Sequence, residues 1–235
     1  MGTEDKDGAP KATGPLVDYR WLRDRDDPRV VALIEQETAD ARAYLRATAA
    51  LEADIVQEIQ GRFVPSEEST PVPWGPYSYF SRREEGRDHL IHGRRARHGG
   101  AVEEVVLDEN EIAHGRAHAS VRAYEVSPDH SHLAYVVDFS GGERLELFVR
   151  NLGDGSVVQV ADDVGEALAW AADSRTLFYS SLDSALRPHR IYRCRLGSKR
   201  PHVCVHEEVD GAFRLELAAS ESGEYLFLDA DVGPL

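Results

Sequence analysis

The sequence predicts a mainly β fold in which an N-terminal helical segment precedes a region of short strands. Three observations predict it. Apolar residues follow a helical period as far as Gly61, short β-branched and aromatic runs begin at Tyr77, and part of the strand region repeats along the chain. Of the 235 residues, 42% are apolar, which is enough to bury a core.

The charge balance disfavours two classes of partner. Basic residues number 27 and acidic residues 42, which gives a formal net charge of -15. An acidic surface repels phosphate groups, so we expect neither nucleic acid nor an anionic membrane as a partner.

Residues 1–15 are polar and lack the apolar stretch of a secretory signal, so we expect a disordered lead. No run approaches the roughly 18 apolar residues that a spanning helix needs. The two cysteines fit a reducing compartment better than a disulfide scaffold. We therefore expect a cytoplasmic protein.

Residues 16–61 are expected to form helices. Asp27 followed by Pro28 is typical of a helix start, because the carboxylate can cap free N–H groups and proline loses nothing at the first helical position. Gly61 is placed to end a second helix in the left-handed conformation. The residues expected on the apolar faces are Val30, Ile34, Ala41 and Leu45 in the first helix and Leu51, Ile55 and Ile59 in the second.

Residues 62–74 are expected to form a linker, because Pro65, Pro71 and Pro73 resist both a helix and a central strand. Residues 75–235 show a β pattern without a helix long enough for the crossover of a parallel sheet, which favours antiparallel pairing. The expected strands are 77–80, 104–107, 133–137, 145–149, 177–179, 191–196, 203–206 and 225–228.

The strand region repeats with an offset of 44 residues. The matching pairs are Asp129 with Asp173, Leu133 with Leu177, Tyr135 with Tyr179, and Leu147 with Ile191. A weaker third copy runs through Ser222, and a worn first copy begins at Gly75. This period is typical of propeller blades, which bury their faces against neighbouring blades. A β-sandwich is the alternative, but it does not require two strands to keep one offset.

Residues 75–235 have room for three blades and part of a fourth, whereas closed rings typically have about 4–8 blades. We therefore expect an incomplete propeller and a chain that is part of a longer protein. An open blade would expose strand edges and apolar surface, through which the chain could self-associate.

The sequence contains no complete catalytic signature. It lacks Gly-x-Ser-x-Gly and both glycine-rich phosphate motifs. We assign no catalytic, cofactor-binding or metal-binding residue, and we expect no cofactor.

One group of residues is a candidate for a metal site or a disulfide. His202, Cys204 and His206 alternate along an expected strand, and Cys194 could lie opposite Cys204 across a hairpin. The two histidines are too far apart on one strand to bind the same zinc ion. We prefer two half-buried strand cysteines to a zinc cluster or a cross-strand disulfide, and their redox state stays open.

The other aromatic and histidine side chains are assigned structural roles. Trp21, Trp74 and Trp170 are expected to pack in cores rather than to form ligand platforms. The histidines expected to be exposed are His114, His118, His130 and His132.

Several segments resemble the prolyl oligopeptidase family. Residues 18–24, with the sequence DYRWLRD, precede Asp27-Pro28 and a helix, and together they are similar to that family's opening motif. Residues 177–183 and 187–197 resemble its oligopeptidase B branch in particular. Residues 124–129 and 170–173 fit the same branch.

The resemblance implies a two-part serine peptidase. In this family a seven-bladed propeller covers the active site of an α/β-hydrolase domain, on which the N-terminal helices pack. Short peptides are the substrates, and the oligopeptidase B branch cleaves after Lys or Arg. The family's catalytic triad and specificity carboxylates belong to the hydrolase domain, so no residue here takes over such a role.

The resemblance makes this chain the N-terminal helices and first three to four blades of such an enzyme, inactive by itself. The alternative function is a stand-alone, propeller-like module that binds other proteins.

Overall fold

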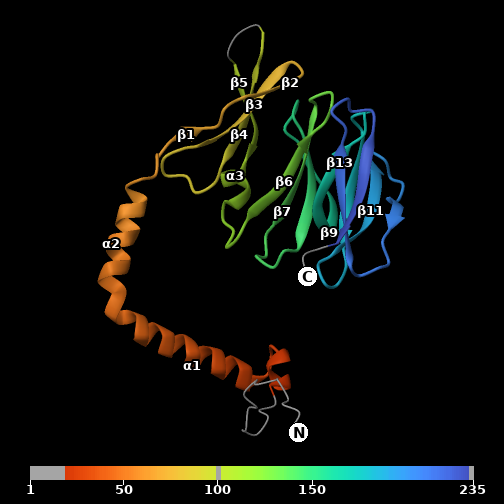
Figure 1. Ribbon diagram of the computed structural model, residues 1–235. Coiled ribbons are helices and arrows are strands. Elements are labelled where there is room, and N and C mark those ends of the chain that lie inside the picture. The colour runs from red at the N-terminus through yellow and green to blue at the C-terminus, as the bar shows by residue number, and fades with distance from the viewer. Residues whose placement is uncertain (1–18, 99–101, 233–235) are drawn as a thin grey trace, which may run out of the picture. The chain divides into compact units, whose positions relative to one another are not determined.

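The computed structural model describes residues 19–98 and 102–232, so the lead expected at residues 1–15 lies outside the described part. The chain divides into two compact units, Met1–Phe63 and Val64–Leu235 (Figure 1). In the described ranges, no helix is both long enough and apolar enough to cross a membrane.

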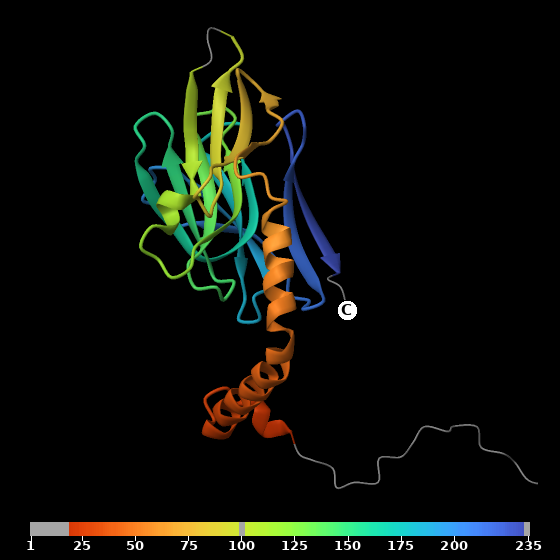
Figure 2. The ribbon, with the colours of Figure 1, turned by 90° about the vertical axis from the view of Figure 1, so that its left-hand side faces the viewer.

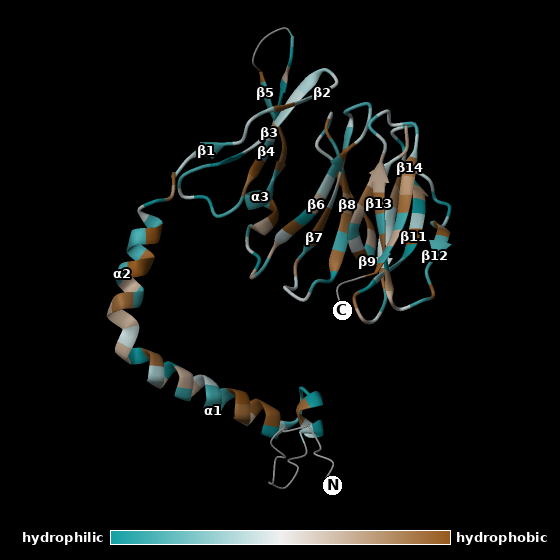
Figure 3. Cartoon of the chain, viewed as in Figure 1, coloured by the Kyte–Doolittle hydropathy of each residue, from teal (hydrophilic) through white to brown (hydrophobic). Residues whose placement is uncertain are grey.

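The first unit is helical. It consists of η1 (Arg20–Arg23), α1 (Pro28–Leu45), η2 (Arg46–Thr48) and α2 (Ala49–Gln60). Asp27 caps α1 as predicted, because its carboxylate accepts the N–H of Arg29 at 2.9 Å and Pro28 takes the first helical position. Within α1 and α2 only Val30 is buried, so the predicted apolar faces of both helices are largely open (Figure 3).

The prediction of a left-handed Gly61 is wrong. Gly61 has φ -66° and ψ -14°, the right-handed helical region. The helix ends instead in tighter turns, in which Arg62 N donates to Ile59 O at 3.0 Å and Phe63 N to Gln60 O at 3.2 Å. Because these bonds close the end of the helix, no left-handed residue is needed there.

The segment 62–74, predicted as a linker, needs a correction, because it contains two short strands. These are β1 (Glu67–Glu68) and β2 (Val72–Trp74), and both pair with β3 (Tyr77–Arg83). Pro73 is tolerated inside β2 because this strand pairs with β3 alone and lies at the sheet edge.

The second unit begins with a five-stranded sheet, which we call the first blade. Its strands are β1, β2, β3, β4 (Ile91–Ala96) and β5 (Glu103–Asp108), with β3 and β4 central. The short helix α3 (Glu109–Ala113), which the sequence pattern did not predict, then leads towards the next sheet. Asp108 starts α3 by accepting the N–H of Asn110 at 2.9 Å.

A seven-stranded sheet follows in the order β12-β11-β10-β9-β8-β7-β6, and all its strand pairs are antiparallel. Its strands are β6 (Ser120–Val126), β7 (His132–Asp138), β8 (Leu145–Asn151), β9 (Val157–Trp170), β10 (Thr176–Leu182), β11 (Pro188–Arg195) and β12 (Val203–Glu207).

The long strand β9 divides this sheet into two blades. Its first half pairs with β8 and its second half with β10, and the register shifts between the halves. We call β6 to the first half of β9 the second blade, and the second half of β9 to β12 the third blade. The hairpin of β13 (Phe213–Ala219) and β14 (Leu226–Val232) begins a fourth. Figures 1 and 2 show these sheets side by side in the second unit.

The sequence repeat corresponds to a repeated turn between the first two strands of a blade. Each copy is closed by a backbone hydrogen bond: Ser127 N to His132 O at 2.8 Å, Ala171 N to Thr176 O at 2.8 Å, and Ser220 N to Tyr225 O at 2.9 Å. Each copy also has one left-handed residue, and these are His130, Ser174 and Gly223. The mainly β fold with a partial propeller is therefore confirmed.

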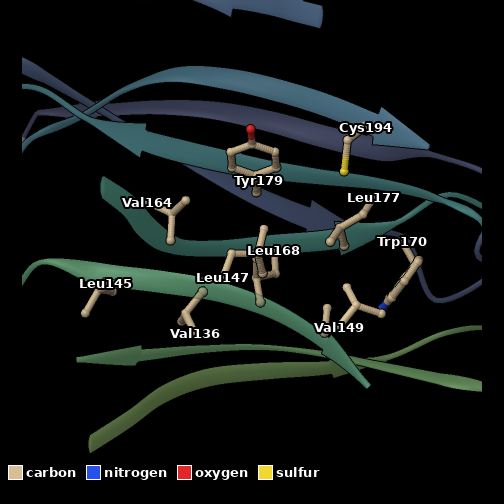
Figure 4. Close-up of a cluster of buried hydrophobic side chains, with 11 residues drawn as sticks. Val136, Leu145, Leu147, Val149, Val164, Leu168, Trp170, Leu177, Tyr179 and Cys194 are labelled. Atoms are coloured by element: carbon tan, nitrogen blue, oxygen red, sulfur yellow. The ribbon is translucent and has the colours of Figure 1, made fainter. Parts of the chain in front are cut away.

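The core lies where blades face one another. The larger cluster joins β7, β8, β9, β10 and β11 and includes Leu147, Leu177 and Trp170 (Figure 4). A second cluster connects Leu107 at the end of the first blade to Leu133 and Val137 in the second. Each sheet thus buries apolar side chains against its neighbours, as propeller packing requires.

Only one of the three tryptophans lies in a core. Trp170 is buried, and its Nε1 donates to Glu125 O at 2.9 Å. Trp74 is 42% exposed, and Trp21 is half-buried with the Arg29 guanidinium 5.1 Å from its ring centre. The prediction of core packing is wrong for Trp74, because β2 lies at a sheet edge, and for Trp21, which belongs to neither buried cluster.

Replacing Leu147 by Ala tests this core. Leu147 has no exposed surface, so we expect a loss of about 2–5 kcal/mol in the free energy of unfolding, from lost transfer energy and the cavity left behind. Urea unfolding followed by circular dichroism measures it. Val158→Ala is the control, because Val158 is 55% exposed and should change stability by less than about 0.5 kcal/mol. Equal losses in the two variants would contradict this description of the core.

Candidate functional site

A cleft of 540 Å³ lies where the first strands of the second, third and fourth blades converge. Arg122 of β6, Glu166 of β9 and Arg214 of β13 contribute charged side chains to it. Its apolar surface comes from Leu145, Leu182, Leu186, Pro188, Leu215 and Leu217. The cleft therefore combines apolar walls with charges of both signs.

An ion pair joins two blades at this cleft. Arg122 Nη2 lies 2.7 Å from Glu166 Oε1, and the two side chains are 44% and 51% exposed. The hydrogen bond to Glu166 raises the pKa of the Arg122 guanidinium, so this group stays charged at neutral pH. Because the pair is exposed, it contributes about 0.2–1 kcal/mol to stability, and its main effect is to place charge at the cleft.

Gly165 lets the floor of the cleft pack closely. A Cβ at this position would collide with Ser180 Oγ and would contact Leu182 and Pro188. Ser180 Oγ is itself buried and has no hydrogen-bond partner. A side chain larger than hydrogen at position 165 would therefore displace the floor of the cleft.

The sequence analysis did not identify Arg122 or Glu166 as site residues. The sequence repeat could have indicated this pair, because the two residues are 44 positions apart, which is the offset of the repeat. Equivalent positions in successive blades lie next to each other around a propeller, so residues one repeat apart can pair.

The residues considered for a metal or disulfide site are not brought together. Cys194 lies opposite Leu177 and Cys204 opposite Tyr192, so both cysteines are free. His202 instead bonds the Tyr179 hydroxyl through Nδ1 at 2.7 Å. In residues 19–98 and 102–232 no group of three or more His, Cys, Asp or Glu side chains could hold a metal ion.

The predictions for individual cysteines and histidines need correction. Cys194 is buried and Cys204 exposed, so the two cysteines are not both half-buried. His114 and His118 are exposed as predicted, but His130 and His132 are half-buried. The turn that holds them packs against neighbouring aromatic rings, which the local sequence does not reveal.

Small antiparallel sheets that repeat along the chain and bury their faces against one another are the architecture of a β-propeller domain. This chain belongs to the prolyl oligopeptidase family, since residues 17–233 match that family's N-terminal beta-propeller domain. The family resemblance noted in the sequence is confirmed, and the chain is homologous to serine peptidases through their propeller domain.

Two curated relatives are peptidases. The uncharacterized peptidase y4qF of Sinorhizobium fredii is 39% identical over 217 residues, which cover 90% of this chain and 28% of the relative. Protease 2 of Moraxella lacunata is 31% identical over 222 residues, which cover 90% of this chain and 32% of the relative.

Two solved structures are also similar. Oligopeptidase B from Leishmania major has a TM-score of 0.82 at 27% identity and matches over 91% of this chain and 31% of its own. Oligopeptidase B from Trypanosoma brucei has a TM-score of 0.76 at 26% identity. The match covers 97% of this chain and 33% of that structure's chain. This chain thus spans about a third of the length of these relatives.

The two thiols should differ in reactivity. Burial raises the pKa of Cys194 to about 11, so this buried thiol carries almost no thiolate near pH 8, whereas Cys204 is exposed. We expect Ellman's reagent to modify one thiol in the folded chain and two after unfolding. In Cys204→Ser the folded chain should not react, and Cys194→Ser should react like the original. Two fast thiols in the folded chain, or none, would contradict this assignment.

Proposed function

We propose that this chain is the N-terminal part of a cytoplasmic serine peptidase that hydrolyses short peptides after basic residues. The match of residues 17–233 to the family's propeller domain carries the proposal. The likeness to two oligopeptidase B structures supports the preference for basic residues. The described part of the chain contains no apparatus for the reaction, so hydrolysis would depend on a hydrolase domain beyond these residues.

In this proposal the blades limit the access of peptides to the active site, and the cleft contacts the peptide. An extended peptide could lay apolar side chains on Leu182, Pro188 and Leu215 while its charged groups meet Arg122 and Glu166. The charges of both signs suit a peptide, which carries a cationic and an anionic end. Chemistry would then take place on the hydrolase domain.

We propose that α1 and α2 bind this hydrolase domain. The side chains of Ile34, Leu51 and Ile59 are 60%, 59% and 50% exposed, which is unusual for apolar residues at regular spacing on a helix. A helix face of this kind is stabilised when another apolar surface covers it. A hydrolase domain would supply that surface.

The alternative, a module that binds other proteins through its open blade, also has an observation in its favour. Tyr225 and Phe227 at the start of the last hairpin strand are 64% and 58% exposed. Self-association through this strand would bury them. Sedimentation at increasing concentrations of the purified chain would then show a defined oligomer.

Isolation of the protein from its source tests the proposed activity. An antibody against residues 18–61 should recover material that reacts with a fluorophosphonate, because an activated serine attacks this reagent. The same material should cleave a peptide after Arg faster than its Glu counterpart. The purified 235-residue chain is the control and should do neither. Recovered material that shows no labelling and no hydrolysis would contradict the proposal.

A charge on the apolar helix face should weaken contact with the hydrolase domain. In the recovered protein, the double change Ile55→Glu and Ile59→Glu should lower activity about tenfold or more, because an unpaired charge in an apolar contact costs more than about 1.4 kcal/mol. Glu52→Gln on the same helix is the matched control and should retain activity. Unchanged activity in the double variant would show that this face is not the contact.

A further inference from the structure

One histidine takes part in the contact between the first and second blades, in addition to the apolar cluster of Leu107 and Leu133. His130 belongs to the turn between β6 and β7, and its Nδ1 lies 2.8 Å from the Tyr79 hydroxyl of β3. The rings of Trp74 and Tyr77 lie 4.6 Å and 5.5 Å from the imidazole, centre to centre. We call this arrangement the His130 contact.

An arginine of the first blade holds the same turn. Arg94 of β4 donates from Nη1 to the His130 carbonyl oxygen at 2.6 Å and lies 4.1 Å above the Tyr77 ring. Glu104 Oε2 accepts from Arg94 Nη2 at 2.7 Å. The positive charge of Arg94 lies close to His130. Because Arg94 is buried, little water screens this charge.

The other imidazole nitrogen faces a glycine. Gly75 is left-handed, with φ 55°, and a Cβ at that position would collide with His130 Nε2. The imidazole therefore packs directly against the backbone of the β2–β3 turn. In the neutral tautomer with its proton on Nε2, Nδ1 accepts a hydrogen bond from the Tyr79 hydroxyl.

The equivalent contacts of the next blades do not use an ionisable side chain at this position. In the third blade Ser174 Oγ accepts the N–H of Asp129 at 3.0 Å. In the fourth, Gly223 has no side chain, and nothing lies within 4 Å of where a Cβ would be. Of these three left-handed residues, His130 alone changes charge near neutral pH.

We propose that the His130 contact is an acid-sensitive connection, closed while the imidazole is neutral and weakened when it gains a proton. A proton on Nδ1 turns this nitrogen from an acceptor into a donor, so the Tyr79 hydroxyl must reverse its hydrogen bond, and the new positive charge lies on the residue whose carbonyl oxygen Arg94 binds. The rings of Trp74 and Tyr79 offset part of this cost, whereas Arg94 already occupies the face of Tyr77.

The surrounding charges support the proposal. Burial lowers the pKa of His130, the positive charge of Arg94 lowers it further, and Asp129 opposes this in part. His130 therefore binds a proton less strongly in the folded contact than it does when the turn is unfolded. Its stability is complete above the ordinary histidine pKa of 6.5 and falls as the pH drops below that value.

A second histidine of the first blade is placed differently. His92 packs against the Tyr124 ring of the second blade at 4.6 Å, and its Nε2 lies 2.7 Å from Glu109 Oε1. The charged neighbour of His92 is therefore a carboxylate, whereas that of the His130 turn is the Arg94 guanidinium. We therefore assign the acid response to His130.

Hydrogen exchange of the 235-residue chain between about pH 7.5 and pH 5.5 tests the proposal, because histidine changes charge in this range. After correction for intrinsic exchange, amides of β3 and β4 should open severalfold more often at the acidic end, relative to those of β10 and β11. His130→Asn should remove this difference, because asparagine tolerates the left-handed backbone at φ 61° but does not titrate. His114→Asn is the control and should behave like the original chain.

Two results would overturn the proposal. One is an acid response of β3 and β4 that persists in His130→Asn or is missing from the original chain. The other comes from an NMR titration of the His130 ring proton. We expect a midpoint below 6.5, and a midpoint at or above that value would show that the contact does not disfavour the proton.

Discussion

The need to cover both faces of every sheet is the constraint on which the strand-rich unit depends. A four-stranded sheet has two faces, and each can bury its apolar residues only against another sheet. Leu147 and Leu177 in neighbouring blades belong to one cluster and have no exposed surface. The cleft to which Arg122, Glu166 and Arg214 contribute lies where the first strands of these blades converge.

The sequence predicted the parts of the fold that local patterns encode. The cap at Asp27, the antiparallel strands and the 44-residue repeat are such patterns. It did not predict β4, β6, β9 or β13. In β4, Gly93 and two arginines interrupt the apolar pattern, and in β9 the alternation is broken where the strand passes from one blade to the next. Gly61 also kept a helical conformation, since the choice of cap depends on where the chain goes afterwards.

The residues of the site were harder to predict than the fold, because they acquire their roles from neighbours far along the chain. His130 was expected to be exposed, yet it meets Tyr79, which is 51 residues away. Arg122 and Glu166 look like ordinary surface charges until the blades stack. Contacts of this kind depend on how sheets are placed, and a single sequence contains that information only through its repeat.

The shared strand β9 affects which changes of chain length the protein can accept. A residue added within a strand turns every later side chain to the opposite face, so an insertion in β9 would disturb two blades at once. Asp163, left-handed at φ 50° where the register shifts, already takes up one such irregularity. Between the first and second blades the chain passes instead through α3 and a loop, which can lengthen without altering either sheet. Insertions and deletions among homologues should therefore collect between the first two blades and avoid the junction of the next two.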